Sequence, residues 1–285
     1  MSFSPAISLA LGFLLAAVVG LVAQRRGALR PGGVLGATLV GGFVFGLGGP
    51  TWAGVLIAFF LSSTLLSFFR REHKSALLAT AAKDGRRDFR QTLANGGLAA
   101  LLAILAGIVT RQSPWYPSLA LAYLGAISAA TADTWATELG VLSPQPPRLL
   151  TTGQPVPAGR SGAVSRYGLA ASLGGGLFLG LSAFVLIQLA SLLTTGEWFL
   201  QDWFVIPLCA VAGLTGSLFD SLLGATLQHQ RYCPRCHALT ERSIHTCGTG
   251  TVYRRGILWL DNDLVNLLGT VAGALTGALA GLLVM

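Results

Sequence analysis

Charged residues are scarce in this chain. Of its 285 residues, 11% are Asp, Glu, Lys or Arg, and only 11 residues are acidic, whereas a soluble domain carries about 25% charged residues. Hydrophobic residues make up 53% of the chain, and the mean hydropathy is +0.66. This composition excludes a water-soluble globular protein and predicts an all-α, polytopic membrane helix bundle that forms one domain over residues 1–285.

Two common nucleotide-binding signatures are also missing. The chain has no G-x-x-x-x-G-K-[ST] sequence and no G-x-G-x-x-G after a strand, so neither a P-loop nor a dinucleotide-binding fold is expected. Many of its 37 glycines lie in apolar runs such as 32–49 and 269–283. Because small residues let helix backbones approach closely in lipid, we interpret these runs as packing surfaces.

Apolar runs near 20 residues long predict eight transmembrane helices. The expected spans are about 5–23, 33–49, 51–69, 92–110, 115–137, 164–193, 203–228 and 264–285. Basic residues test this count, because Lys and Arg collect in cytoplasmic loops. Together with Arg166, 18 of the 19 basic residues lie in alternate connections, which are 24–32, 70–91, 138–163 and 229–263.

This segregation predicts the orientation. The basic loops are expected in the cytoplasm and both termini outside, in the cell (inner) membrane, with an uncleaved first helix because no basic residue precedes it. The net charge of +8 would then lie at the cytoplasmic face, where it suits anionic membrane lipids, nucleotides or phosphates rather than nucleic acid. The sequence leaves the oligomeric state open.

Smaller features of the loops and span ends have ordinary interpretations. Lys74 and Lys83 are expected to be solvated charges on an amphipathic cytoplasmic segment. Tryptophans that flank the spans are interpreted as interfacial anchors, and they are Trp52, Trp115, Trp198, Trp203 and Trp259.

Polar seams interrupt two of the apolar spans near their basic ends. In 216–228, the positions i, i+3, i+4, i+7 and i+11 share one helical face, and they are occupied by Ser217, Asp220, Ser221, Gly224 and Gln228. In 85–97, Arg87, Gln91 and Asn95 repeat every four residues. Each seam predicts a polar strip inside the bundle.

Carboxylates at the ends of spans need a compensating charge. Asp133 and Glu138 are five residues apart, about 140° around a helix, so they do not share a face. An acid in the hydrocarbon costs roughly 2.5–3.5 kcal/mol and usually faces the bundle interior. Each acid alone suits an interhelical ion pair. Together with Asp220 and Asp263 they suggest a Mg²⁺ and phosphate site, with Asp133, Glu138 and Asp220 expected within metal-bridging reach.

Four motifs carry a resemblance to a known family. They are GRRDFRQTLANGG (85–97), ADTWATELGVLSPQPPRLLTTGQPVPAGRSGAVSRYG (132–168), GLTGSLFDSLLGATLQ (213–228) and DNDLVN (261–266). In this order they resemble the integral membrane family that includes phytyl-phosphate kinases and the animal transmembrane protein nineteen. The resemblance implies transfer of a phosphoryl group from a nucleoside triphosphate, CTP or ATP, to an isoprenyl monophosphate.

The family motifs coincide with the polar residues found from spacing. The expected catalytic residues are Asp133, Glu138, Asp220 and Asn95, with Asp263 as a further Mg²⁺ ligand. The expected substrate-binding residues are Arg87, Arg90, Gln91, Arg160, Ser161, Ser165, Ser221, Gln228 and Asn266. Arg160 departs from the family pattern, so it either binds a phosphate or is a lipid-facing cytoplasmic charge.

The connection 229–263 contains a cysteine-rich cluster. Cys233 and Cys236 form a C-x-x-C pair, and His245 and Cys247 follow, a spacing that suits a tetrahedral Zn²⁺. His237 is a competing fourth ligand. We therefore expect a structural zinc knuckle in a cytoplasmic insertion loop, with no part in catalysis.

Two other classes of function fit the same residues. A prenol or lipid kinase, or a cytidylyltransferase acting on a lipid phosphate, would need the same site. A transporter would use the carboxylates as an ion path, but it is expected to place them near the midplane and to show an internal repeat.

Overall fold

The computed structural model describes residues 4–77, 85–109 and 112–283. The helices that cross the bundle are α1 (Pro5–Arg25), α2 (Pro31–Phe43), α3 (Pro50–Phe68), α5 (Phe89–Ile108), α6 (Tyr116–Gly140), α7 (Arg166–Thr195), α8 (Val205–Thr226) and α9 (Asn262–Leu283). Shorter helical segments are the π-helical η1 (Val44–Gly48), α4 (Arg71–Leu77) and the 3-10 segment η2 (Leu200–Phe204). The strands are β1 (Arg148–Leu149), β2 (Ala163–Val164), β3 (Gln230–Cys233), β4 (Ala238–Thr240) and β5 (Val252–Arg255).

Local sequence explains where several helices begin. Proline occupies the first turn of α1, α2, α3 and α6, where its missing N–H removes no helical hydrogen bond. Asp88 and Gln91 form a reciprocal capping box at the start of α5, and the Ser165 side chain caps α7. These caps set the chain direction at the entries to the helices that carry the site.

The predicted bundle is confirmed. In the described part of the chain, seven helices are long and apolar enough to cross a membrane. The remaining predicted span is α6, which is 25 residues long and contacts α3, α5, α7, α8 and α9. Every residue from Leu121 to Ala132 is buried. Since α6 is surrounded by protein, it does not need the hydropathy of a lipid-facing helix.

Glycine allows the helices to pack closely around α6. A Cβ atom at Gly277 of α9 would lie 2.0 Å from the Leu121 carbonyl oxygen, and one at Gly125 of α6 would lie 2.1 Å from the Gly273 carbonyl oxygen. Neither distance is compatible with a side chain. The small residues of 269–283 therefore form the packing surface that their spacing predicts.

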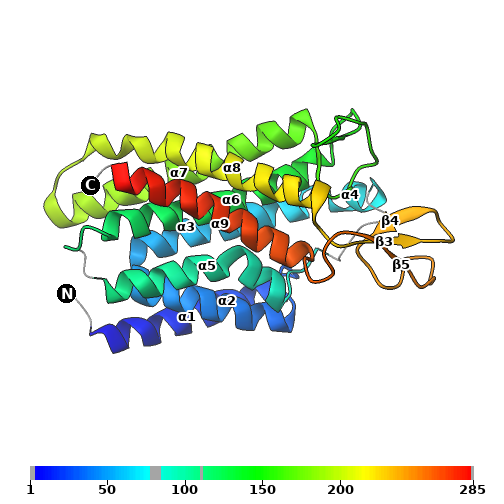
Figure 1. Cartoon of the computed structure of the whole chain (residues 1–285). Coiled ribbons are helices and arrows are strands. Elements are labelled where there is room, and N and C mark those ends of the chain that lie inside the picture. The colour runs from blue at the N-terminus through cyan, green and yellow to red at the C-terminus, as the bar shows by residue number, and fades with distance from the viewer. Residues whose placement is uncertain (1–3, 78–84, 110–111, 284–285) are drawn as a thin grey trace.

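The two ends of the bundle differ in structure. Figure 1 shows both termini at one end, and β3, β4 and β5 beyond the other. These strands form an antiparallel sheet in the order β4-β3-β5, and β1 pairs with β2 in the connection between α6 and α7. We call the end with the strands the basic end, because its connections carry nearly all of the basic residues.

One aromatic anchor is corrected by the structure. Trp115, Trp198, Trp203 and Trp259 are exposed, as interfacial anchors should be, but Trp52 is only 7% exposed. Its ring stacks on Tyr123, whose hydroxyl donates to the Trp52 carbonyl oxygen at 2.7 Å. Trp52 thus satisfies a buried tyrosine of α6 and contributes to the core.

Candidate functional site

A cavity of about 210 Å³ lies at the basic end. Its walls come from α6, α7, α8, the first residue of α9 and the loop 141–165. Its polar lining residues are Asp133, Thr137, Arg160, Ser161, Ser165, Ser172, Ser217, Asp220, Ser221, Gln228, Glu241 and Asn262. The whole polar seam predicted on 216–228 therefore faces this cavity and the loop that covers it.

Two glycines bring the loop against α8. A Cβ atom at Gly162 would lie 2.1 Å from the Ala225 nitrogen, and one at Gly224 would lie 2.7 Å from the Gly162 nitrogen. Gly162 also has a φ of +77°, which disfavours other residues. This close approach places Arg160 and Ser161 beside the end of the α8 seam.

Carboxylates concentrate at the cavity. Asp133 and Asp220 come from α6 and α8, and Glu241 follows β4. The charges of Asp133 and Glu241 both act unfavourably on Asp220, and Asp220 Oδ2 is buried with no hydrogen-bond partner among the described residues. Buried polar atoms in native proteins are nearly always paired, so this oxygen indicates a place for a ligand or a cation.

Arg160 supplies the opposite charge. Its Nε is buried and has no hydrogen-bond partner among the described residues. Burial lowers the pKa of Arg160, and the neighbouring positive charge of Arg255 lowers it further. Because an arginine stays protonated, this guanidinium is suited to an anion. Arg160 lines the cavity, which favours the phosphate-binding alternative over the lipid-facing one.

Glu241 was not among the residues selected from the sequence. It accepts hydrogen bonds from Ser161 Oγ at 2.9 Å and from Gln228 Nε2 at 2.8 Å, so it joins two predicted substrate-binding residues. Its position in a polar loop gave no periodic signal. The one sequence feature that could have drawn attention to Glu241 is that the chain contains so few acidic residues.

Glu138 lies apart from this cavity's lining and does not join the expected carboxylate cluster. Its Oε1 accepts from Ser67 Oγ at 2.6 Å, and its Oε2 forms an ion pair with Lys74, which also donates to the Leu66 carbonyl oxygen at 2.7 Å. Lys74 is 5% exposed, so it is not the solvated loop charge that was expected. Lys83 lies outside the described residues. The 140° turn between Asp133 and Glu138 directs them to different neighbours.

The seam of Arg87, Gln91 and Asn95 lines a second cavity of about 80 Å³. Its other walls are mostly apolar and come from α1, α2, η1, α3 and α5. The Arg87 guanidinium lies 5.5 Å from the Phe59 ring centroid. Burial lowers the pKa of Arg87, and the negative charge of Glu138 opposes this shift. Asn95 donates to the Gln91 carbonyl oxygen at 3.0 Å, so these polar groups bound one end of an apolar pocket.

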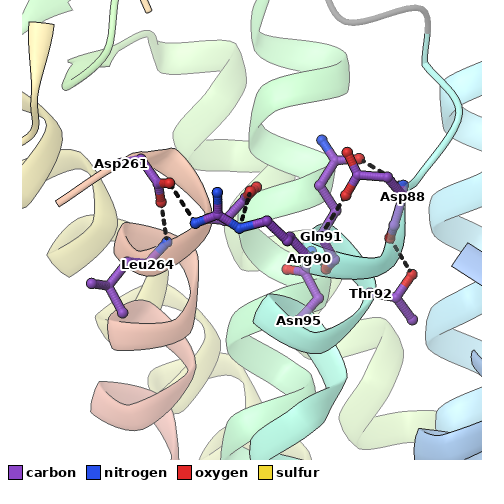
Figure 2. Close-up of polar contacts among 8 residues, drawn as sticks. Asp88, Arg90, Gln91, Thr92, Asn95, Asp261 and Leu264 are labelled. Carbon is purple, nitrogen blue, oxygen red and sulfur yellow. Dashed lines mark hydrogen bonds and ion pairs between the residues drawn. The ribbon is translucent and has the colours of Figure 1, made fainter. Parts of the chain in front are cut away.

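Arg90 forms ion pairs with Asp261 and Asp263. Figure 2 shows Arg90 reaching from α5 to the start of α9, where its Nη2 lies 2.6 Å from Asp261 Oδ2. Its Nε lies 3.7 Å from Asp263 Oδ2. Asp263 is therefore neutralised by Arg90 and lies outside the group formed by Asp133 and Asp220. Asn266 lies one turn further along α9.

Ser165 and Ser221 have simple placements. Ser165 Oγ accepts from the Gly168 nitrogen at 3.0 Å and donates to the Gly140 carbonyl oxygen at 3.4 Å. It therefore caps α7 and ties the loop to the end of α6, while it also lines the cavity. Ser221 lines the cavity one residue after Asp220.

Cysteine and histidine side chains converge in the sheet beyond the helices. Among the described residues, the only group of three or more Cys, His, Asp or Glu whose ligand atoms all lie within 4.8 Å consists of Cys233, Cys236, His245 and Cys247. The predicted carboxylate cluster is therefore not preformed. His237 Nδ1 instead lies 2.7 Å from Tyr232 Oη, so His245 occupies the fourth position. Hydrogen bonds with Thr249 and then His245 lower the pKa of Cys247 to about 5, which favours the metal-binding thiolate.

The chain resembles several known proteins along most of its length. It is 31% identical to Protein PGR of Arabidopsis thaliana over 277 residues, which cover 94% of each chain. It is 30% identical to an uncharacterized membrane protein of Methanocaldococcus jannaschii, over 96% of this chain and 94% of that protein. It is 22% identical to the chloroplastic Protein VTE6 of Arabidopsis thaliana, over 88% of this chain and 65% of that protein. No solved structure matches.

The family model described as integral membrane protein DUF92 matches residues 14–274. This range includes all of α2, α3, α5, α6, α7 and α8, parts of α1 and α9, and every residue that lines the cavity at the basic end. The matched proteins agree with the resemblance carried by the four motifs. The chain is thus a member of the DUF92 family of integral membrane proteins.

Proposed function

We propose that this protein transfers a phosphoryl group from a nucleoside triphosphate to an isoprenyl monophosphate at the cytoplasmic leaflet. The observation that carries the proposal is the cavity at the basic end. A buried carboxylate oxygen of Asp220 and the Nε of Arg160 lie in its lining, and neither has a hydrogen-bond partner among the described residues. A site for an anion and its divalent cation needs both kinds of group.

The residues suit Mg²⁺ held against substrate phosphates. Asp133 and Asp220 offer hard oxygen ligands, and Mg²⁺ is commonly held by one or two carboxylates together with substrate phosphates. When bound, the ion would neutralise charge on the transferred group. This role would also relieve the repulsion between the two carboxylates.

Protein groups would position the substrates. Arg160 binds phosphate oxygens, while Ser161 and Ser165 lie on the same loop at the cavity wall. An oxygen of the lipid monophosphate attacks the γ-phosphorus of the nucleotide. The bond from that phosphorus to the β–γ bridging oxygen breaks, so the products are a lipid diphosphate and a nucleoside diphosphate. The prenyl tail stays in the bilayer.

The test is a direct assay of purified protein. Phytyl phosphate is incubated with Mg²⁺ and γ-labelled CTP or ATP, and label should appear in the lipid diphosphate. Asp133→Asn should reduce turnover on the order of 100-fold, the loss typical of removing a group that stabilises transition-state charge. The substitution removes charge and little volume, so thermal unfolding should change little.

A matched control is Glu197→Gln, because Glu197 is exposed and follows α7 at the end opposite the cavity. It should keep full turnover. Normal activity of Asp133→Asn at limiting Mg²⁺ would refute the metal-ligand role.

The same assay separates the rival activities. Release of pyrophosphate with a nucleotide-linked lipid would identify a cytidylyltransferase, and label transfer to a prenyl alcohol would identify a prenol kinase. If none of these substrates is converted and the protein in vesicles instead shows Mg²⁺-dependent flux, the result would favour a transporter.

A further inference from the structure

The sheet of β3, β4 and β5 has no apolar core to hold it together. Within the described residues, the hydrophobic core clusters include none from these strands. The buried residues of 230–255 are polar or metal-binding types, and they are Gln230, Cys233, Thr240, His245 and Thr251. A sheet this small needs another source of stability, such as a metal ion.

The thiol geometry matches a tetrahedral metal site. Cys233 Sγ and Cys247 Sγ are 3.7 Å apart, close to the roughly 3.8 Å between two sulfurs bound tetrahedrally to one zinc at Zn–S distances of about 2.3 Å. A disulfide would require about 2.05 Å. His245 Nδ1 lies 3.2 Å from Cys247 Sγ. Three thiols and one imidazole within 4.8 Å form a complete zinc ligand set.

Glu241 lies in the segment between the second and third of these ligands, Cys236 and His245. It directly follows β4, and the next residue's carbonyl oxygen, that of Arg242, accepts from Thr251 Oγ1 at 2.6 Å. Arg231 of β3 donates in turn to Thr251 Oγ1 at 2.7 Å. A metal ion bound by the four ligands would therefore hold Cys236 and His245, which bound the segment that presents Glu241 to the cavity.

We propose that Cys233, Cys236, His245 and Cys247 bind one structural Zn²⁺, and that the zinc-closed sheet positions Glu241 as a clamp at the mouth of the cavity. Glu241 accepts from Ser161 of the loop and from Gln228 at the end of α8. The clamp therefore joins the loop that carries Arg160 to the seam that carries Asp220. The zinc site does not depend on the proposed phosphoryl transfer. Any effect of the clamp on turnover does rest on that proposed function.

Metal analysis tests the first half without any activity assay. Freshly purified reduced protein should contain one zinc per chain, and Co²⁺ exchanged into the site should give tetrahedral d–d and thiolate charge-transfer absorption. Cys236→Ser should abolish both signals. Cys209→Ala is the matched control, because Cys209 is buried in α8, and it should keep one zinc. Less than about a tenth of an equivalent in the wild-type protein would overturn the zinc site.

Hydrogen exchange tests the clamp. Removing zinc should raise amide exchange in residues 157–165 about tenfold, the change expected for losing one or two hydrogen bonds. Glu241→Ala should raise it equally with zinc still bound, whereas Glu241→Gln keeps an acceptor oxygen and should keep most of the protection. Unchanged exchange after zinc loss would overturn the clamp.

These readouts also separate the two proposals. Protein that binds zinc and shows the predicted exchange, yet transfers no phosphate, would refute the proposed function and leave the zinc clamp standing. Protein that transfers phosphate but contains no zinc would refute the zinc clamp and leave the proposed function standing.

Discussion

At the scale of single residues, the acids at the basic end fall into two kinds. Glu138 is matched by Lys74, and Asp263 by Arg90. Asp220 has an oxygen with no hydrogen-bond partner in the described part of the chain, and it has two carboxylates nearby. Paired acids are ordinary interhelical contacts, whereas an unpaired buried acid is expensive. This difference separates the structural carboxylates from those we assign to a ligand.

The Lys74–Glu138 pair should contribute mainly to stability. Lys74→Met leaves a carboxylate in a mostly buried site without its ion-pair partner, so unfolding should become easier by about 3–5 kcal/mol. The double variant Lys74→Met/Glu138→Gln should recover much of this loss, because it removes both charges. Thermal unfolding in detergent measures both. Unchanged stability with abolished turnover in Lys74→Met would instead assign the pair to the reaction.

At the scale of elements, the site depends on the crossing of the loop over the end of α8. The loop has positive φ at Gly153, Gly159 and Gly162. A Cβ atom at Gly162 would collide with the α8 backbone, whereas one at Gly153 would have no described atom within 4 Å. Conformation and close contact can therefore be tested separately within one loop.

Two alanine substitutions make this comparison. Gly153→Ala should cost only the strain of its φ of +67°, about 1–2 kcal/mol, because no atom of the described residues lies within 4 Å of its Cβ position. Gly162→Ala has a similar φ but would also collide with Ala225, so it should unfold at a lower temperature and lose turnover. Equal effects in both unfolding and activity measurements would show that the crossing does not shape the cavity.

At the scale of the whole molecule, the bundle has one chemically distinct end. Figure 1 shows β3, β4 and β5 at the end opposite both termini. The cluster of Cys233, Cys236, His245 and Cys247 lies in and around these strands, and Glu241, which lines the cavity, directly follows β4. The connections at this end carry nearly all of the basic residues. We propose that this end faces the cytoplasm, because the positive-inside rule favours that orientation. Nucleotides would then be available to the cavity.

Cysteine labelling in intact cells tests this orientation. Glu197→Cys should react with a membrane-impermeant thiol reagent without permeabilisation, because Glu197 is exposed between α7 and η2. Thr152→Cys, on the exposed loop 141–165, should react only after permeabilisation. The opposite pattern would invert the topology and place the cavity away from cytoplasmic nucleotides.

The sequence by itself determined the features that depend on local composition and period. The apolar runs gave the bundle, and the spacing of Ser217, Asp220, Ser221 and Gln228 identified the face of α8 that lines the cavity. The C-x-x-C pair belongs to the cluster of Cys233, Cys236, His245 and Cys247. These features can be read from the sequence because hydropathy, helical periodicity and short motif spacing are properties of neighbouring residues.

Only the tertiary structure decided which charges meet. Glu138 contacts Lys74, 64 residues earlier in the chain, and Glu241 contacts Ser161, 80 residues earlier. It also selected His245 instead of His237 for the cysteine cluster. A carboxylate's partner depends on which helices and loops pack against its face, and that packing is set by backbone contacts between distant glycines such as Gly125 and Gly273.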